Sequence, residues 1–301
     1  MMRDRFRALV SLGLTVVCLL CLPGCIPNAA GQFLGAQALG AQALGAQGTV
    51  PAPAPAGESG VDILVQGALD SELQPLLAAL EGKEQIQIAA WTFWRGRIGR
   101  KRVVVSRTEV GPVNASVATT LAITNFRPQL IINQGTAGAT DPDLKVFDLV
   151  VGESTVDYGA FISTHADAGQ GVDLSRWQPY YHRLRLDGKE RIQFKSFPGD
   201  QEAMNVALET PYRRSRVIKG VIGSAFEFNK EIDRLIWVKK TYGNVTEDME
   251  SAFSAAAAAG FKTRFLAIRI ISDSEFHSPN LREEAGEYSA AFVVDVIKRI
   301  K

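Results

Sequence analysis

Short apolar runs that alternate with helical segments constrain the fold of this chain more than any other feature. The clearest run, residues 130–133, has three consecutive branched apolar side chains and ends in a glycine-containing segment. Runs of this kind are typical of strands buried on both faces of a sheet, so helices must cover both faces. We therefore predict an α/β fold, a three-layer α/β/α domain around a central mixed sheet. The expected strands are 61–65, 86–94, 102–106, 130–133, 147–153, 217–222 and 265–271, and the expected helices are 70–80, 112–125, 249–259 and 283–300.

The composition fits a globular protein, with 46% hydrophobic and 22% charged residues among 301. The formal net charge is +1. Removing residues 1–25 takes away three arginines and one aspartate, which leaves 30 basic and 31 acidic residues. A chain that is nearly neutral and lacks a basic stripe argues against nucleic acid as a partner.

The first 25 residues have the pattern of a bacterial lipoprotein signal peptide. Arg3, Arg5 and Arg7 precede an apolar run over residues 8–22, which is short for a membrane span. The run ends in Leu-Pro-Gly-Cys, which resembles a lipobox and makes Cys25 the expected lipidation site. Plain secretion and an uncleaved anchor remain as alternatives. The protein is thus expected to be exported and held in the cell envelope through a lipid on Cys25.

Residues 26–60 are predicted to form a tether between this anchor and the folded domain, which we place at residues 61–301. A five-residue repeat, LGAQA, occupies 34–48, and alternating proline and alanine follow over 51–55. Such sequences form weakly structured or extended polyproline-type segments.

Three motifs follow or precede the predicted strands. The first motif is Asn133 to Gly138, which includes Thr136 and Ala137 and follows an apolar strand. Taken alone, this motif indicates either a tight turn or a place where backbone amides approach a ligand. Glu247 to Ser251 opens an alanine-rich helix, where acids commonly just complement the helix dipole, although one could bind both hydroxyls of a ribose. The third motif, Arg269 to Asp273, is the end of a buried strand and closes with Ser-Asp. The aspartate can be either a helix cap or a catalytic acid.

Taken together, these motifs resemble the methylthioadenosine/S-adenosylhomocysteine nucleosidases of the purine nucleoside phosphorylase superfamily. The resemblance runs from about residue 61 to the end and is weak over 155–215 and after Glu275. It rests on Val110 to Ala115, Ile131 to Gly138, Leu144 to Val151, Asp248 to Ala252 and Arg269 to Asp273.

The resemblance implies a role for each matching residue. Asp273, next to Ser272, matches the acid that protonates purine N7, and Glu72 matches the base that activates water. Arg269 and Thr136 match residues that help hold that water. Thr136, Ala137, Gly138 and Ser272 are expected to bind the substrate. Glu250 matches the ligand of the ribose diol and Met249 the residue that packs under the sugar, while Phe228 resembles the aromatic that stacks on the purine. No metal and no cofactor are implied, and relatives of this kind suggest a homodimer.

The segment around Glu72 bears on the reaction type. Phosphorylases of this superfamily hold phosphate with an arginine in a Gly-Asp-Pro-x-Arg turn, whereas this chain has Gly67-Ala68-Leu69-Asp70-Ser71-Glu72. An acid at that place favours hydrolysis of a purine nucleoside to base and ribose moiety over phosphorolysis. A phosphate-dependent phosphorylase and a non-catalytic nucleoside-binding lipoprotein are the alternatives. The segment 224–227 departs from the family pattern, so the loop beside the base is the least well matched part.

Overall fold

The computed structural model describes residues 60–301. The predicted signal peptide, the lipidation site Cys25 and the predicted tether up to residue 59 lie outside the described residues.

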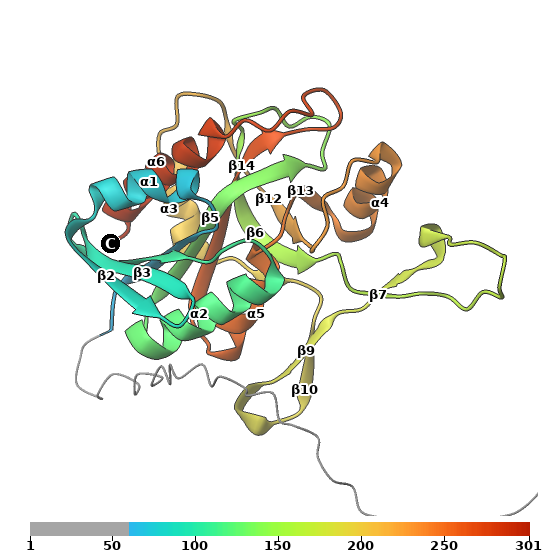
Figure 1. Ribbon diagram of the computed structural model, residues 1–301, viewed down its shortest axis with the longest axis horizontal. Coiled ribbons are helices and arrows are strands. Elements are labelled where there is room, and N and C mark those ends of the chain that lie inside the picture. The colour runs from blue at the N-terminus through green and yellow to red at the C-terminus, as the bar shows by residue number, and fades with distance from the viewer. Residues whose placement is uncertain (1–59) are drawn as a thin grey trace, which may run out of the picture. The chain divides into compact units, whose positions relative to one another are not determined.

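A large mixed sheet forms the centre of the domain (Figure 1). Its strands run in the order β11-β6-β12-β13-β5-β1-β4-β3-β2, and β14 pairs with both β5 and β6. β1 is parallel to β4 and β5, whereas β2, β3 and β4 form an antiparallel meander at one edge. The bounds are β1 Ile63–Gly67, β2 Glu81–Ile88, β3 Trp91–Ile98, β4 Lys101–Arg107, β5 Leu130–Ala139, β6 Leu149–Asp157, β11 Phe197–Pro198, β12 Val217–Ser224, β13 Asn244–Asp248 and β14 Arg264–Asp273.

Five of these strands close into a barrel. β5 pairs with β13, β13 with β12, β12 with β6, β6 with β14, and β14 returns to β5. A closed ring leaves no free edge between its members, so their ends are held at fixed positions relative to one another.

Helices cover both faces of the sheet, as the apolar strands require. α1 (Asp70–Ala79), α3 (Gln201–Glu209) and α6 (Glu284–Arg299) pack on one face, and α2 (Pro112–Phe126) and α5 (Ser251–Gly260) pack on the other (Figure 1). α4 (Ile232–Tyr242) packs beside the barrel over Tyr158 and Ala225. In β1, Ile63 and Val65 belong to the core under α1 and α6, while Leu64 belongs to the opposite core. The predicted three-layer α/β fold is therefore confirmed.

Several predicted boundaries are wrong. The stretch 86–94 is not one strand, because a two-residue turn at Ala89 and Ala90 separates β2 from β3, and Ala89 takes a left-handed φ of 50° there. An Ala-Ala pair carries none of the glycine or asparagine signal of such turns, so the pattern did not reveal it. The predicted glycine turn at 133–138 is also wrong, since β5 continues to Ala139 between β14 and β13.

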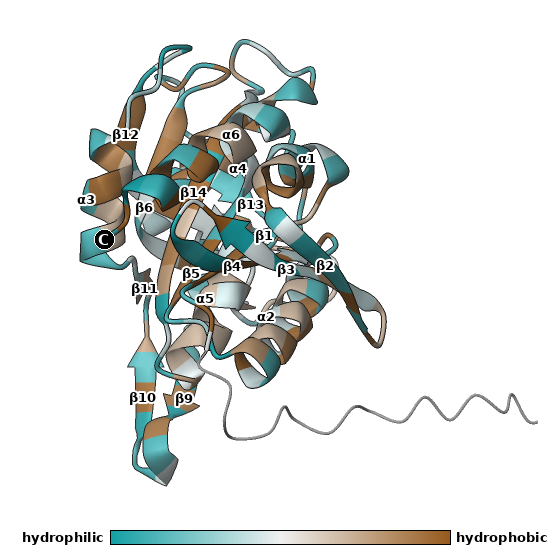
Figure 2. Ribbon diagram, turned by 90° about the vertical axis from the view of Figure 1, so that its left-hand side faces the viewer, coloured by the Kyte–Doolittle hydropathy of each residue, from teal (hydrophilic) through white to brown (hydrophobic). Residues whose placement is uncertain are grey.

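The segment between β6 and β11 forms small hairpins of its own. β7 (Phe161–Ile162) pairs with β8 (Gln178–Pro179), and β9 (His182–Arg185) pairs with β10 (Arg191–Phe194). Figure 2 shows the β9–β10 hairpin reaching away from the layers of the domain. The 3₁₀ turns η1 (Leu174–Arg176) and η2 (Leu186–Gly188) complete this region. Among residues 60–301, no helix is both long and apolar enough to span a membrane.

Candidate active site

A pocket of about 160 Å³ opens where β1 and β14 end and along the last residues of β5 and β13. Carboxyl ends of parallel strands are where α/β sheets place their ligands. The lining residues are Ala68, Leu69, Glu72, Val110, Thr136, Ala137, Gly138, Glu227, Phe228, Glu247, Asp248, Met249, Glu250, Ser272, Asp273 and Leu281.

Glu72 is held by four hydrogen bonds on one side of the pocket. Its Oε2 accepts from the backbone N–H groups of Ala68 and Leu69 at 2.7 and 3.1 Å. Its Oε1 accepts from the backbone N–H and the hydroxyl of Thr136 at 2.8 and 3.0 Å. The backbone of Gly135 lies against this carboxylate, where a Cβ atom would be 2.7 Å from Oε1. Four donors hold both oxygens, so the side chain of Glu72 is fixed in one orientation at the pocket.

Glu250 also lines the pocket and is the residue directly before α5. Its Oε1 accepts from the backbone N–H of Gly111 at 2.9 Å. Gly111 has a φ of 100°, a conformation open to glycine, and this brings its N–H to the carboxylate. Burial raises the pKa of Glu250, the nearby charge of Asp248 adds to the effect, and Arg269 opposes it.

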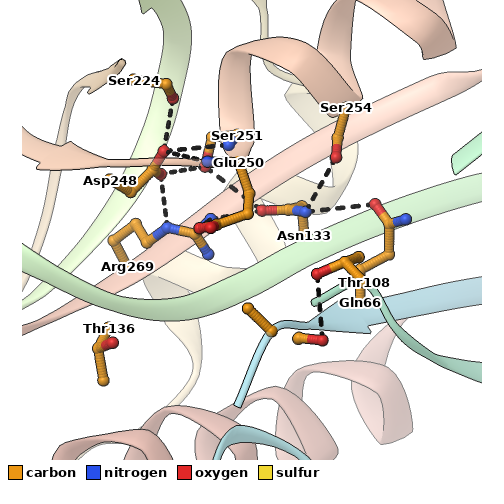
Figure 3. Close-up of polar contacts among 12 residues, drawn as sticks. Gln66, Thr108, Asn133, Thr136, Ser224, Asp248, Glu250, Ser251, Ser254 and Arg269 are labelled. Carbon is orange, nitrogen blue, oxygen red and sulfur yellow. Dashed lines mark hydrogen bonds and ion pairs between the residues drawn. The ribbon is translucent and has the colours of Figure 1, made fainter. Parts of the chain in front are cut away.

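Behind Glu250, a buried polar network fixes the start of α5 (Figure 3). Asp248 accepts from the backbone N–H groups of Glu250 and Ser251, both at 3.0 Å, and from the Ser251 hydroxyl. Arg269 donates from Nε to Asp248 at 2.6 Å and from Nη2 to Asn133 Oδ1 at 2.6 Å. Burial alone would lower the pKa of Arg269, but the surrounding carboxylates outweigh it and raise it.

Asp273 is the last residue of β14 and also lines the pocket. The Ser272 hydroxyl donates to its Oδ1 at 2.6 Å, and a Cβ on Gly138 would lie 3.5 Å from its Oδ2. Burial raises the pKa of Asp273; the Ser272 hydrogen bond opposes this, and the charge of Glu275 adds to it. A carboxyl group with a raised pKa keeps its proton closer to neutral pH, which suits a general acid.

Nine of the ten residues expected to act on or bind a nucleoside line this one pocket: Glu72, Thr136, Ala137, Gly138, Phe228, Met249, Glu250, Ser272 and Asp273. Arg269 is the exception. We expected it to hold the attacking water, but it is 1% exposed and its Nη2 lies 3.7 Å from Glu250 Oε2, behind the lining. Its guanidinium pairs with Asp248 instead, so the geometry makes it a support for the wall.

Three lining acids, Glu227, Glu247 and Asp248, have no role predicted from the sequence. Glu247 and Asp248 are in β13, a strand that the pattern did not predict, rather than in the first turn of α5. The strand is only five residues long and mostly polar, so neither periodicity nor apolar run marks it. The three acids at 247, 248 and 250, close together before an alanine-rich helix, are the signal that the sequence offers.

The charge of the lining is one-sided. Six carboxyl residues line the pocket and no lysine, arginine or histidine does: Glu72, Glu227, Glu247, Asp248, Glu250 and Asp273. Within residues 60–301, no group of three or more histidine, cysteine, aspartate or glutamate side chains is arranged to hold a metal ion. Such a site favours neutral or cationic ligands and disfavours anions.

Curated relatives align with this chain over nearly all of the folded domain. The 5'-methylthioadenosine/S-adenosylhomocysteine nucleosidase of Tolumonas auensis is 29% identical over 244 residues, which is 78% of this chain and 97% of that protein. The enzyme of the same name from Staphylococcus haemolyticus is 28% identical over 77% of this chain and 97% of its own length.

Solved structures share the fold. The 5'-methylthioadenosine/S-adenosylhomocysteine nucleosidase of Neisseria meningitidis, in complex with methylthio-immucillin-A, matches with a TM-score of 0.63 at 24% identity and covers 79% of this chain and 98% of its own. The futalosine hydrolase of Helicobacter pylori matches with a TM-score of 0.63 at 22% identity, over 78% and 97% of the two chains.

The family model of the phosphorylase superfamily matches residues 62–299, which is nearly all of the part that the structure describes. The mixed sheet, its closed barrel and the pocket at the strand ends agree with that match. The chain therefore belongs to the phosphorylase superfamily.

Proposed function

We propose that this chain hydrolyses the N-glycosidic bond of a purine nucleoside of the adenosine type, such as methylthioadenosine or S-adenosylhomocysteine. The observation that carries the proposal is that Glu72, Glu250 and Asp273 line a single pocket, each with different hydrogen-bond partners. The names of the relatives from Tolumonas and Staphylococcus support the same reaction.

The sugar would lie between Glu72 and Glu250. Glu250 has one oxygen on the Gly111 N–H, and its other oxygen can accept from the two ribose hydroxyls. Met249, beside it, lines the same wall and can pack under the ring. Arg269 acts as a positioning residue, because it holds Asp248, which in turn holds the backbone of Glu250.

The base would lie at the end that Phe228 and Asp273 share. Phe228 is exposed at the rim, where its ring can stack on a purine face. Asp273 gives its proton to N7 as the bond between N9 and the anomeric carbon breaks, so the electron pair of that bond stays on a neutral base. Glu72 takes a proton from the water whose oxygen forms the new bond to the anomeric carbon.

The reaction type follows from the charge of the lining. The transition state carries positive charge on the sugar, which the carboxyl groups of Glu72 and Glu250 beside it can stabilise. Inorganic phosphate would meet those carboxyl groups without a lining cation to pair with. Water is therefore the better nucleophile here, although the superfamily includes phosphate users by name.

The mouth of the pocket bears on the 5′-substituent. Leu69, Val110 and Leu281 line it and are exposed to solvent. A ligand that covers them gains about 25 cal/mol per Å² of apolar surface, so we propose that a 5′-alkylthio nucleoside is preferred to adenosine itself.

The experiment is the release of free purine by the purified full chain from methylthioadenosine, S-adenosylhomocysteine, adenosine and inosine, with and without phosphate. Free adenine and free sugar at equal rates in both buffers would support hydrolysis. Release that requires phosphate and gives ribose 1-phosphate would make the chain a phosphorylase. Tight binding of nucleosides in a calorimeter without any release would make it a nucleoside-binding protein.

We propose further that the protein is exported and anchored to a bacterial envelope membrane through a lipid on Cys25. The arginine-rich start, the apolar run and the cysteine at its end support this, together with the repeat and proline-rich tether that follow. Cells fed an alkyne-labelled fatty acid should label the wild-type chain and not Cys25→Ser. Equal labelling of the wild-type chain and the Cys25→Ser variant, or no labelling of either protein, would contradict the proposal.

A further inference from the structure

Glu247 is a pocket residue that the proposed mechanism does not use. It comes from β13, and its neighbour across the sheet on β5 is Gly138. Gly138 is also the register partner of Asp273 on β14. The two acids thus flank one glycine, from strands on either side of it.

The missing side chain of Gly138 leaves the space between the two acids open. A Cβ atom there would lie 3.5 Å from Oε1 of Glu247 and 3.5 Å from Oδ2 of Asp273. The two oxygens are therefore at most about 7 Å apart and face the same space. A base held by one of them is within reach of the other.

The other carboxyl oxygen of Glu247, Oε2, accepts hydrogen bonds from two side chains of the protein. Oε2 accepts from the Tyr158 hydroxyl at 3.0 Å and from Asn229 Nδ2 at 2.6 Å, and the backbone N–H of Asn229 also donates to the carboxyl group. Tyr158 is fully buried behind it, and Asn229 follows Phe228 directly in the chain. The carboxyl group is thus fixed in orientation, with Oε1 facing the space above Gly138 and its hydrogen-bond donors on the side where the purine would stack.

We infer that Glu247 reads the substituent at position 6 of the purine, accepting a hydrogen bond from a 6-amino group, and so sets a preference for 6-aminopurine over 6-oxopurine nucleosides. This rests on the proposed function. On the edge of a purine that holds N7, the neighbour that points away from the sugar is the group at position 6. With N7 on Asp273, that group faces the Phe228 side of the pocket, where Glu247 lies.

The protonation of Glu247 adds a second consequence. Burial raises its pKa to about 7, against the hydrogen bonds from Asn229 and Tyr158, and the charge of Asp273 adds to the rise. On the loop after β12, Glu227 pairs with Arg234, and Lys230 lies nearest to Glu275. As a carboxylate, Glu247 accepts from an amino group; with a proton, it can donate to a 6-oxo group instead.

The test compares three substrates with the same sugar and the same 5′-methylthio group, on the full chain: a 6-amino, a 6-oxo and a 6-unsubstituted purine. Glu247→Gln should lower the 6-amino to 6-oxo ratio of kcat/KM at least about tenfold, the loss expected for a hydrogen bond to a charged group. The 6-unsubstituted substrate should change little. In the wild type the ratio should rise as pH increases through about 7, and in the variant it should stay flat.

Glu275→Gln is the matched control, because it removes a carboxylate near Asp273 that does not line the pocket. It should leave the substrate ratio unchanged. An equal loss on all three substrates in Glu247→Gln would overturn the inference and leave Glu247 as a support for the Phe228 loop. A wild-type ratio that is independent of pH would also count against it, and this measurement needs no variant. No turnover of any substrate by the wild type would instead refute the proposed function.

Discussion

Gly135→Ala is the change that tests the assignment of Glu72 most sharply. The added Cβ would lie 2.7 Å from Oε1, 2.8 Å from Cδ and 2.9 Å from Oε2 of Glu72, about 0.7 Å inside ordinary van der Waals contact. The carboxylate must move, and the two hydrogen bonds from Thr136 to Oε1 are the first to be lost. A displacement approaching 1 Å of a reacting group costs on the order of 10²-fold in rate, or about 2.7 kcal/mol.

The assay is kcat/KM for purine release, beside the free energy of unfolding in urea. We expect Gly135→Ala to fold, at a cost of about 1–3 kcal/mol for the crowded site, and to lose about 10²-fold in kcat/KM. Gly260→Ala is the control, because a Cβ there meets no atom within 4 Å. A folded Gly135→Ala protein with activity within threefold of the wild type would show that Glu72 does not activate the water from this position.

Three further changes address the other parts of the site. Asp273→Asn should lower kcat about 10²- to 10⁴-fold and leave nucleoside binding by calorimetry nearly intact. Because the active form of Asp273 is protonated, wild-type activity should fall as pH rises through its raised pKa, and the pH–rate profile of the variant should lack that limb. Glu72→Gln should lose a similar factor in kcat, and unchanged turnover would exclude it as the base. Arg269→Met should cost about 3–5 kcal/mol in urea unfolding, since it leaves Asp248 and Glu250 buried without their cation; a loss below 1 kcal/mol would contradict the support that we assign to it.

The parts of the fold that could be predicted are those that depend on burial. Apolar runs such as 130–133 and 265–271 required a sheet covered on both faces, and α5 and α6 follow from their alanine-rich and amphipathic patterns. The site residues could be named because short motifs resembled a family, whereas their mutual geometry could not. Nothing local reveals, for example, that Gly111 donates to Glu250 across 139 positions of sequence.

The parts that could not be predicted are set by tertiary structure. β13 is a strand because β12 and β5 flank it, and its own five residues are largely polar. The same holds for Arg269, whose match with a water-holding residue gave no hint that Asp248 and Asn133 occupy its guanidinium. A side chain whose role is to hold another side chain in place cannot be recognised from the periodicity of apolar residues.

The packing of α6 against α1 has a consequence for the order in which the active site comes into being on the ribosome. Gly286 of α6 lies so close to α1 that a Cβ on it would be 3.1 Å from Cγ of Glu72 and 2.6 Å from the Ser71 hydroxyl. The helix that carries the proposed base, among the first parts of the domain to be synthesised, is thus backed by the last helix to be synthesised. Until α6 has packed onto α1, Glu72 lacks this backing, so we expect a chain that ends before residue 284 to show no activity.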